Sequence, residues 1–79
     1  MGKYDPLFRY LQRSQNQQVT LTYSEIEKIL GVSLPASSHK DPRWWLNHDK
    51  THVQSSAWCD AKFVVKKVVL GEYVIFSRE

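Results

Sequence analysis

The chain has 79 residues, which predicts one domain, 1–79, because chains below about 100 residues rarely divide. Its one cysteine, Cys59, excludes an intrachain disulfide, and no run approaches the roughly 18 apolar residues of a membrane span. The net charge of +3 suits a polyanionic partner but also ordinary solubility. Because no apolar signal segment follows Met1, we expect a reducing, cytoplasmic location.

The first element is a helix from Pro6 to Arg13. Asp5-Pro6 is a helix start, with an N-cap acid before a proline at the first helical position. Leu7 and Leu11 then follow at helical spacing. The polar stretch 14–18 predicts a loop, and the β-branched alternation of residues 19–22 predicts a short strand.

A second helix follows this strand. Thr22 has Glu25 three residues on, and Ser24 has Glu27, so either register offers a capping box. Gly31 ends the helix as a C′ glycine. Residues 35–40 predict a loop, and residues 41–46 a short helical segment that repeats the Asp-Pro start signal.

A further helix begins at Ser55 or Ser56 and contains Trp58, and a hairpin ends the chain. The hairpin strands cover residues 63–70 and 73–76, and the two residues between them suit a type II′ turn with glycine first. That register places Leu70 opposite Tyr73. Both faces of the hairpin carry apolar residues, so either both are covered or one is a contact surface.

These elements predict an α+β domain with three or four short helices and a three-stranded antiparallel sheet, in the order of a winged helix. The first strand pairs with the hairpin, and the helix around Trp58 takes the position of the recognition helix. One departure is evident. A helix-turn-helix joins its two helices by three or four residues, whereas residues 32–54 separate Gly31 from the Trp58 helix.

The segment from residue 40 to residue 54, called the 40–54 segment, concentrates basic, aromatic and amide side chains. Arginine and lysine bind phosphate or guanine, asparagine and glutamine pair with adenine edges, and tryptophan stacks on unstacked bases. The candidate nucleic-acid-binding residues are Lys40, Arg43, Trp44, Trp45, Asn47, Lys50, His52 and Gln54.

A structural interpretation of the same segment stays open. Neighbouring residues on a helix point about 100° apart, so at least one of Trp44 and Trp45 is expected in the core. Asn47 suits a left-handed helix end, and Gln54 suits a cap on loop backbone.

Metal and catalytic sites are not predicted. His48 and His52 have the spacing of half a zinc site, but the usual cysteine pair is missing. Cys59 beside Trp58 is better explained as a buried, inert thiol than as a nucleophile. We therefore expect no cofactor, no catalytic residue and no enzymatic activity.

The chain resembles a small bacterial and phage domain family of unknown function. The similarity rests on residues 3–7, on 19–22 with 25–27, on 29–31 with 34–35, on Trp44-Trp45-x-Asn47, and on His52, Gln54, Ala57 and Trp58. Members that accompany nuclease or restriction-type proteins imply a DNA-directed role. The resemblance also implies alanines, a glycine and a tryptophan within residues 59–63, from which this chain departs.

The predicted function is a non-catalytic nucleic-acid-binding module, with DNA as the expected nucleic acid. The alternative is a protein-interaction module. Such a module would be a phage or mobile-element protein that docks on a host factor, or a homodimer formed through the C-terminal hairpin.

Overall fold

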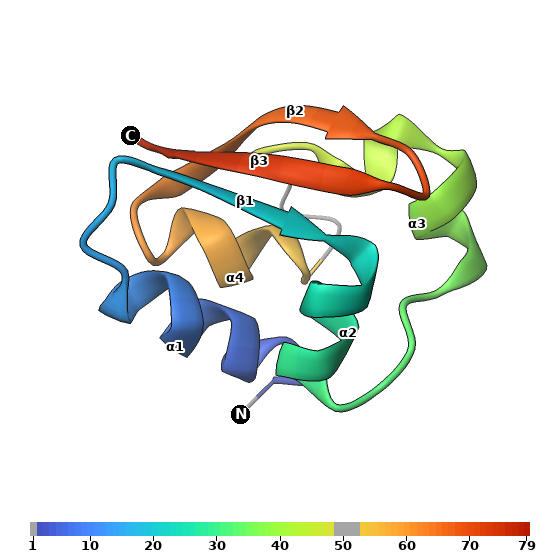
Figure 1. The fold of residues 1–79 in the computed structure, drawn as a ribbon, viewed down its shortest axis with the longest axis horizontal. Helices are drawn as coiled ribbons and strands as arrows, with labels where there is room; N and C mark the ends of the chain where they lie inside the picture. The colour runs from blue at the N-terminus through green and yellow to red at the C-terminus, as the bar shows by residue number, and fades with distance from the viewer. Residues whose placement is uncertain (1, 49–52) are drawn as a thin grey trace.

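The computed structural model describes residues 2–48 and 53–79, and within them it confirms the predicted α+β class (Figure 1). The elements in chain order are α1 (Asp5–Arg13), β1 (Gln18–Thr22), α2 (Tyr23–Leu30), α3 (Ala36–Lys40), the 3-10 helix η1 (Pro42–Trp45), α4 (Ser55–Cys59), β2 (Phe63–Val69) and β3 (Tyr73–Arg78). No helix among the described residues has the length and apolar character needed to cross a membrane.

Local signals set the ends of the first two helices. The predicted Asp5 cap is wrong, because α1 begins at Asp5 itself after Tyr4, without a side-chain cap hydrogen bond, and Pro6 lies in its first turn. At α2, the Glu25 N–H donates to Thr22 Oγ1 at 3.1 Å and the Thr22 N–H donates to Glu25 Oε1 at 2.9 Å, so the capping box begins at Thr22. Gly31 follows α2 with φ 75°, in the left-handed region.

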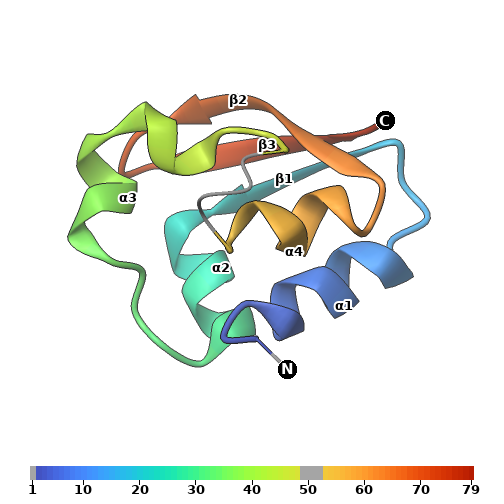
Figure 2. The same ribbon diagram turned by 180° about the vertical axis from the view of Figure 1, so that it is seen from behind.

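The three strands form one antiparallel sheet in the order β1-β3-β2, with β3 in the centre. The predicted pairing of the first strand with the terminal hairpin is therefore confirmed. The helices α1, α2 and α4 lie on one side of the sheet in both views (Figures 1 and 2). Val74 and Phe76 of β3 point to that side and are fully buried.

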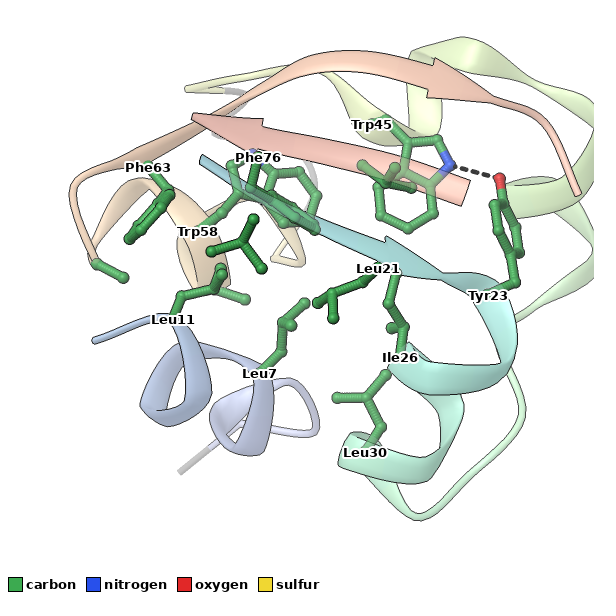
Figure 3. Packing of buried hydrophobic residues seen from close by; sticks show 14 of the residues in the cluster. Leu7, Leu11, Leu21, Tyr23, Ile26, Leu30, Trp45, Trp58, Phe63 and Phe76 are labelled. Atoms are coloured by element: carbon green, nitrogen blue, oxygen red, sulfur yellow. Dashed lines mark hydrogen bonds between the residues drawn. The ribbon is translucent and has the colours of Figure 1, made fainter. Parts of the chain in front are cut away.

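Large apolar side chains fill the space between the sheet and the helices (Figure 3). Leu7 and Leu11 enter from α1, and Trp58 enters from α4. Trp58 lies against Trp45 with ring centroids 5.6 Å apart and planes at 26°. The tryptophan-rich segment thus supplies part of the core, where aromatic rings bury the most area per residue.

The predicted hairpin register is wrong by one residue. Tyr73 lies opposite Val69, not Leu70. Gly71 has φ 78°, and the turn closes through the Glu72 N–H donating to Val69 O at 2.9 Å. The positive φ falls at the second central residue of this turn, whereas a type II′ turn requires it at the first.

A β-bulge between Val65 and Lys67 accompanies this register. Val65 and Val68 both pack against the core, while Lys66 and Lys67 are exposed. Strict alternation from Val68 would have turned Lys66 toward the core, and one extra residue in the strand avoids that. Burial of apolar groups therefore decided the register.

The prediction of a loop over residues 35–40 is also wrong, because Ala36–Lys40 forms α3. Ser38 is fully buried, and its Oγ donates to Pro35 O at 2.6 Å. The Ser38 carbonyl accepts from Tyr23 Oη at 2.6 Å and from Trp45 Nε1 at 3.0 Å. This turn has no apolar periodicity of its own, and contacts from distant residues hold it.

Candidate functional site

The two tryptophans of the 40–54 segment have different environments. Trp45 is 2% exposed, and its indole N–H donates to Ser38 O and, at 3.1 Å, to Tyr23 Oη (Figure 3). Trp44 is half-buried and meets Trp45 and Tyr4 edge to face, with centroids 4.6 and 5.9 Å away. As expected for adjacent helical residues, one ring is in the core.

The amide of Asn47 bonds to the outer edge of β2. Its Nδ2 donates to Val65 O at 3.1 Å, and its Oδ1 accepts from the Val65 N–H at 2.8 Å. The same oxygen accepts from Trp58 Nε1 at 2.9 Å. Gln54 is 4% exposed and donates to Trp44 O at 3.1 Å. The polar atoms that base reading requires are thus occupied inside the fold.

The basic residues of the 40–54 segment are exposed where the structure describes them. Lys40 ends α3, and Arg43 lies in η1 with its side chain 80% exposed. Arg43 pairs with Asp41, Nη2 to Oδ2 at 2.9 Å, and the hydrogen bond and charge of Asp41 raise the pKa of Arg43. Lys50 and His52 lie outside the described residues.

The helix in the position of a recognition helix is α4. It has five residues, of which Ser55, Ala57 and Trp58 are buried. It lies between α1 and the sheet in both ribbon views (Figures 1 and 2). A recognition helix needs an exposed face to enter the major groove, and α4 offers little of one.

A different set of residues lines an open cleft of about 710 Å³ beside α1, which we call the α1 cleft. Arg9 and Arg13 are one helical turn apart and exposed, on the side of α1 opposite Leu7 and Leu11. Tyr10 is 43% exposed. The lining residues are Pro6, Arg9, Tyr10, Arg13, Ser14, Gln15, Asn16 and Ile29.

The charged residues that line the α1 cleft are all basic. No acidic side chain is among its lining residues. Within residues 2–48 and 53–79, the salt bridges involve Arg43 and His48, and neither Arg9 nor Arg13 takes part in one. Two guanidinium groups without an internal partner favour an oxyanion, since each presents a fork that matches carboxylate or phosphate.

Arg78, near the end of β3, holds the loop that walls the α1 cleft. Its Nε donates to Asn16 O at 3.2 Å, its Nη2 donates to Ser14 O, and its guanidinium lies 4.8 Å from the ring centroid of Phe63. The Arg78 N–H also donates to Gln17 O at 2.8 Å. The backbone of this wall is therefore tied to the sheet.

Sequence reasoning missed the α1 cleft although a signal was present. Arg9-x3-Arg13 lies on the polar side of a helix, and an amide-rich stretch, 15–18, follows it. The polar side of a helix is ordinarily just solvated. The approach of Ile29 from α2 and of the 14–16 loop makes a concave site of it, and sequence periodicity carries neither.

Cys59 is half-buried and receives the His48 N–H at 3.3 Å. Burial raises the pKa of its thiol most, the carboxylates of Glu79 and Asp60 raise it further, and the His48 N–H opposes them. A thiol in this environment is a weak nucleophile at neutral pH. Within the described residues, no group of three or more His, Cys, Asp or Glu is arranged to hold a metal ion.

Fold and cleft define a small α+β domain with a basic, partly aromatic surface site. Over residues 4–79 the chain matches the family described as "Domain of unknown function (DUF7662)", and it belongs to that family. The predicted membership in a small uncharacterised family is confirmed. No curated protein and no solved structure matches the chain.

Proposed function

We propose that the protein is a non-catalytic nucleic-acid-binding module that holds its ligand in the α1 cleft. The observation that carries the proposal is the pair Arg9 and Arg13, which lack internal partners among the described residues and lie beside the exposed ring of Tyr10. Phosphate contacts supply most of the affinity in nucleic-acid binding, and arginine is suited to them.

The other lining groups suggest how the ligand is arranged. The Tyr10 ring offers a face on which a base can stack, and the Gln15 and Asn16 amides offer donors and acceptors to base edges. Stacking on a side chain requires an unstacked base, so we propose a single-stranded region as the preferred form. DNA is the expected nucleic acid, and the predicted cytoplasmic location suits it.

The test is a titration of labelled single-stranded and duplex DNA by fluorescence anisotropy at about 50 and 200 mM salt. We expect single strands to bind more tightly, and affinity to fall steeply with salt as counterions are released. The double variant Arg9→Ala/Arg13→Ala should bind at least about tenfold more weakly, because hydrogen bonds to charged groups contribute about 1.5–3 kcal/mol each.

The matched control is Lys40→Ala/Arg43→Ala, which removes the same charge from the 40–54 segment. It should weaken binding by less than about threefold. Equal losses in the two double variants would show attraction by net charge and not by the α1 cleft. No binding at protein concentrations near 100 μM and about 50 mM salt would end the proposal, since even non-specific binders reach roughly 10⁻⁴ M.

A protein-interaction module remains the second candidate, favoured by one surface. The side of the hairpin away from the core carries the half-buried residues Val64, Val69, Tyr73 and Ile75. These side chains are outside the set that packs against the core. This candidate implies a host factor or a second copy as the partner. If the DNA titration shows no binding, protein interaction becomes the preferred function.

A further inference from the structure

The two outer edges of the sheet differ in how their backbone groups are used. At β2, Val65 points its N–H and C=O away from β3, and Asn47 bonds to both. At β1, the Arg78 N–H donates to Gln17 O and the Tyr23 N–H donates to Glu72 O. Every second residue of β1 therefore faces β3, from position 17 to position 23, in the alternation of an antiparallel ladder.

The remaining residues of β1 face outward. The N–H and C=O groups of Gln18 and Thr20 point away from β3, while the Thr22 N–H is taken by Glu25. Within the part of the chain that the structure describes, no backbone hydrogen bond reaches Gln18 or Thr20 from that side. No other ribbon crosses in front of β1 in Figure 1.

The β1 edge also lacks the devices that keep edge strands apart. Proteins usually block such edges with lysine, proline or a bulge. Here β2 carries the bulge and two lysines, whereas β1 pairs regularly with β3 and consists of the uncharged residues 18–22. Val19 and Leu21 face the core, and the alternating polar residues are exposed.

We propose that β1 pairs antiparallel with β1 of a second copy, about a two-fold axis at Thr20, and so joins two sheets into one. In this register Thr20 lies opposite Thr20, Gln18 opposite Thr22, and Val19 opposite Leu21. No like charges meet, apolar residues align on the core side, and the two Thr20 residues exchange N–H···O=C bonds. A strand that pairs with this edge needs apolar residues on the core side alternating with polar residues on the outer side. β1 has this alternation itself, which favours a second copy over an unrelated peptide.

Sedimentation equilibrium of the full chain tests the association. We expect the average mass to rise from monomer toward dimer between about 10 μM and 1 mM, because the interface rests on a few backbone bonds. Thr20→Lys places like charges opposite each other at the axis and should weaken association at least about fivefold. The control Ser33→Lys adds the same charge on an exposed loop residue and should leave association unchanged.

Cross-linking tests the register independently of affinity. With Cys59→Ala as background, Thr20→Cys should form an intermolecular disulfide on mild oxidation, because Cα atoms of such a pair lie about 5.5 Å apart. Gln18→Cys should not, since the two cysteines would lie more than about 13 Å apart along the strands. A monomer at about 1 mM, or equal cross-linking of both variants, overturns the proposal, and neither result bears on nucleic-acid binding.

Discussion

The two edge strands of the sheet differ in whether their outward backbone N–H and C=O groups have hydrogen-bond partners. The edge of β2 is closed by a single side-chain amide, because Asn47 presents a donor and an acceptor as a neighbouring strand would. Among the described residues, the edge of β1 leaves the outward backbone groups of Gln18 and Thr20 without a backbone partner, and residues 18–22 carry no charge. Polar side chains that look suited to a ligand can thus serve as partners of backbone groups within the fold.

The same contrast separates the 40–54 segment from the α1 cleft. In the former, Asn47 and Gln54 use their amides within the fold and Arg43 has Asp41. In the latter, Arg9 and Arg13 have no salt bridge within residues 2–48 and 53–79. Density of functional groups in a sequence therefore does not show that those groups are free to bind a ligand.

The largest effect on the free energy of unfolding is expected when the Asn47 amide is removed from the edge of β2. Asn47→Ala removes the partners of the Val65 N–H, the Val65 carbonyl and the Trp58 indole N–H. Unsatisfied buried groups cost about 1–3 kcal/mol each, so the free energy of unfolding should fall by about 3 kcal/mol in urea denaturation. Leu46→Ala, at a neighbouring exposed residue, should change it by less than about 0.5 kcal/mol. Equal small losses in both variants would show that the amide does not hold the edge.

A smaller effect of opposite sign is expected just before β2. Lys62 has φ 68°, in the left-handed region, and its carbonyl accepts the Glu79 N–H at 2.9 Å. It lies in the stretch where the family resemblance implies a glycine. Lys62→Gly should raise the free energy of unfolding by about 0.5–1 kcal/mol, because glycine adopts this conformation without steric cost. Lys62→Ala removes the same charge but keeps the strain, and a gain as large there would refute the backbone explanation.

The smallest effect is on the reactivity of Cys59, which receives the His48 N–H beside the closed edge. Because burial raises the pKa of this thiol, less thiolate is present at any pH below that pKa, and labelling by a disulfide reagent should be slower than for a free cysteine. The pH profile of the rate should lie on the alkaline side of the free-cysteine profile. In Asn47→Ala the rate should rise several-fold as the segment loosens. Identical rates in both proteins would mean that Cys59 is independent of the edge.

Helix ends and strand content could be predicted from sequence because the responsible groups are neighbours in the chain. The capping box of Thr22 and Glu25, the proline at the start of α1 and the left-handed Gly31 each act within one turn. The sequence predicted the hairpin but not its register. The register includes a bulge between Val65 and Lys67, which depends on core contacts across the sheet. α3 was missed because buried contacts with Tyr23 and Trp45 hold it.

Sequence alone determined the α+β class, the order of the elements other than α3, the pairing of the first strand with the hairpin and the membership in an uncharacterised family. Tertiary structure alone decided which polar groups are occupied. Asn47 meets a backbone 18 residues away, and Trp45 meets Tyr23 at 22 residues' separation, whereas the arginines of the α1 cleft meet no acid among the described residues. The physical reason is that a hydrogen-bond partner depends on distance in space, and spacing in sequence encodes that distance only within a helix turn or a hairpin.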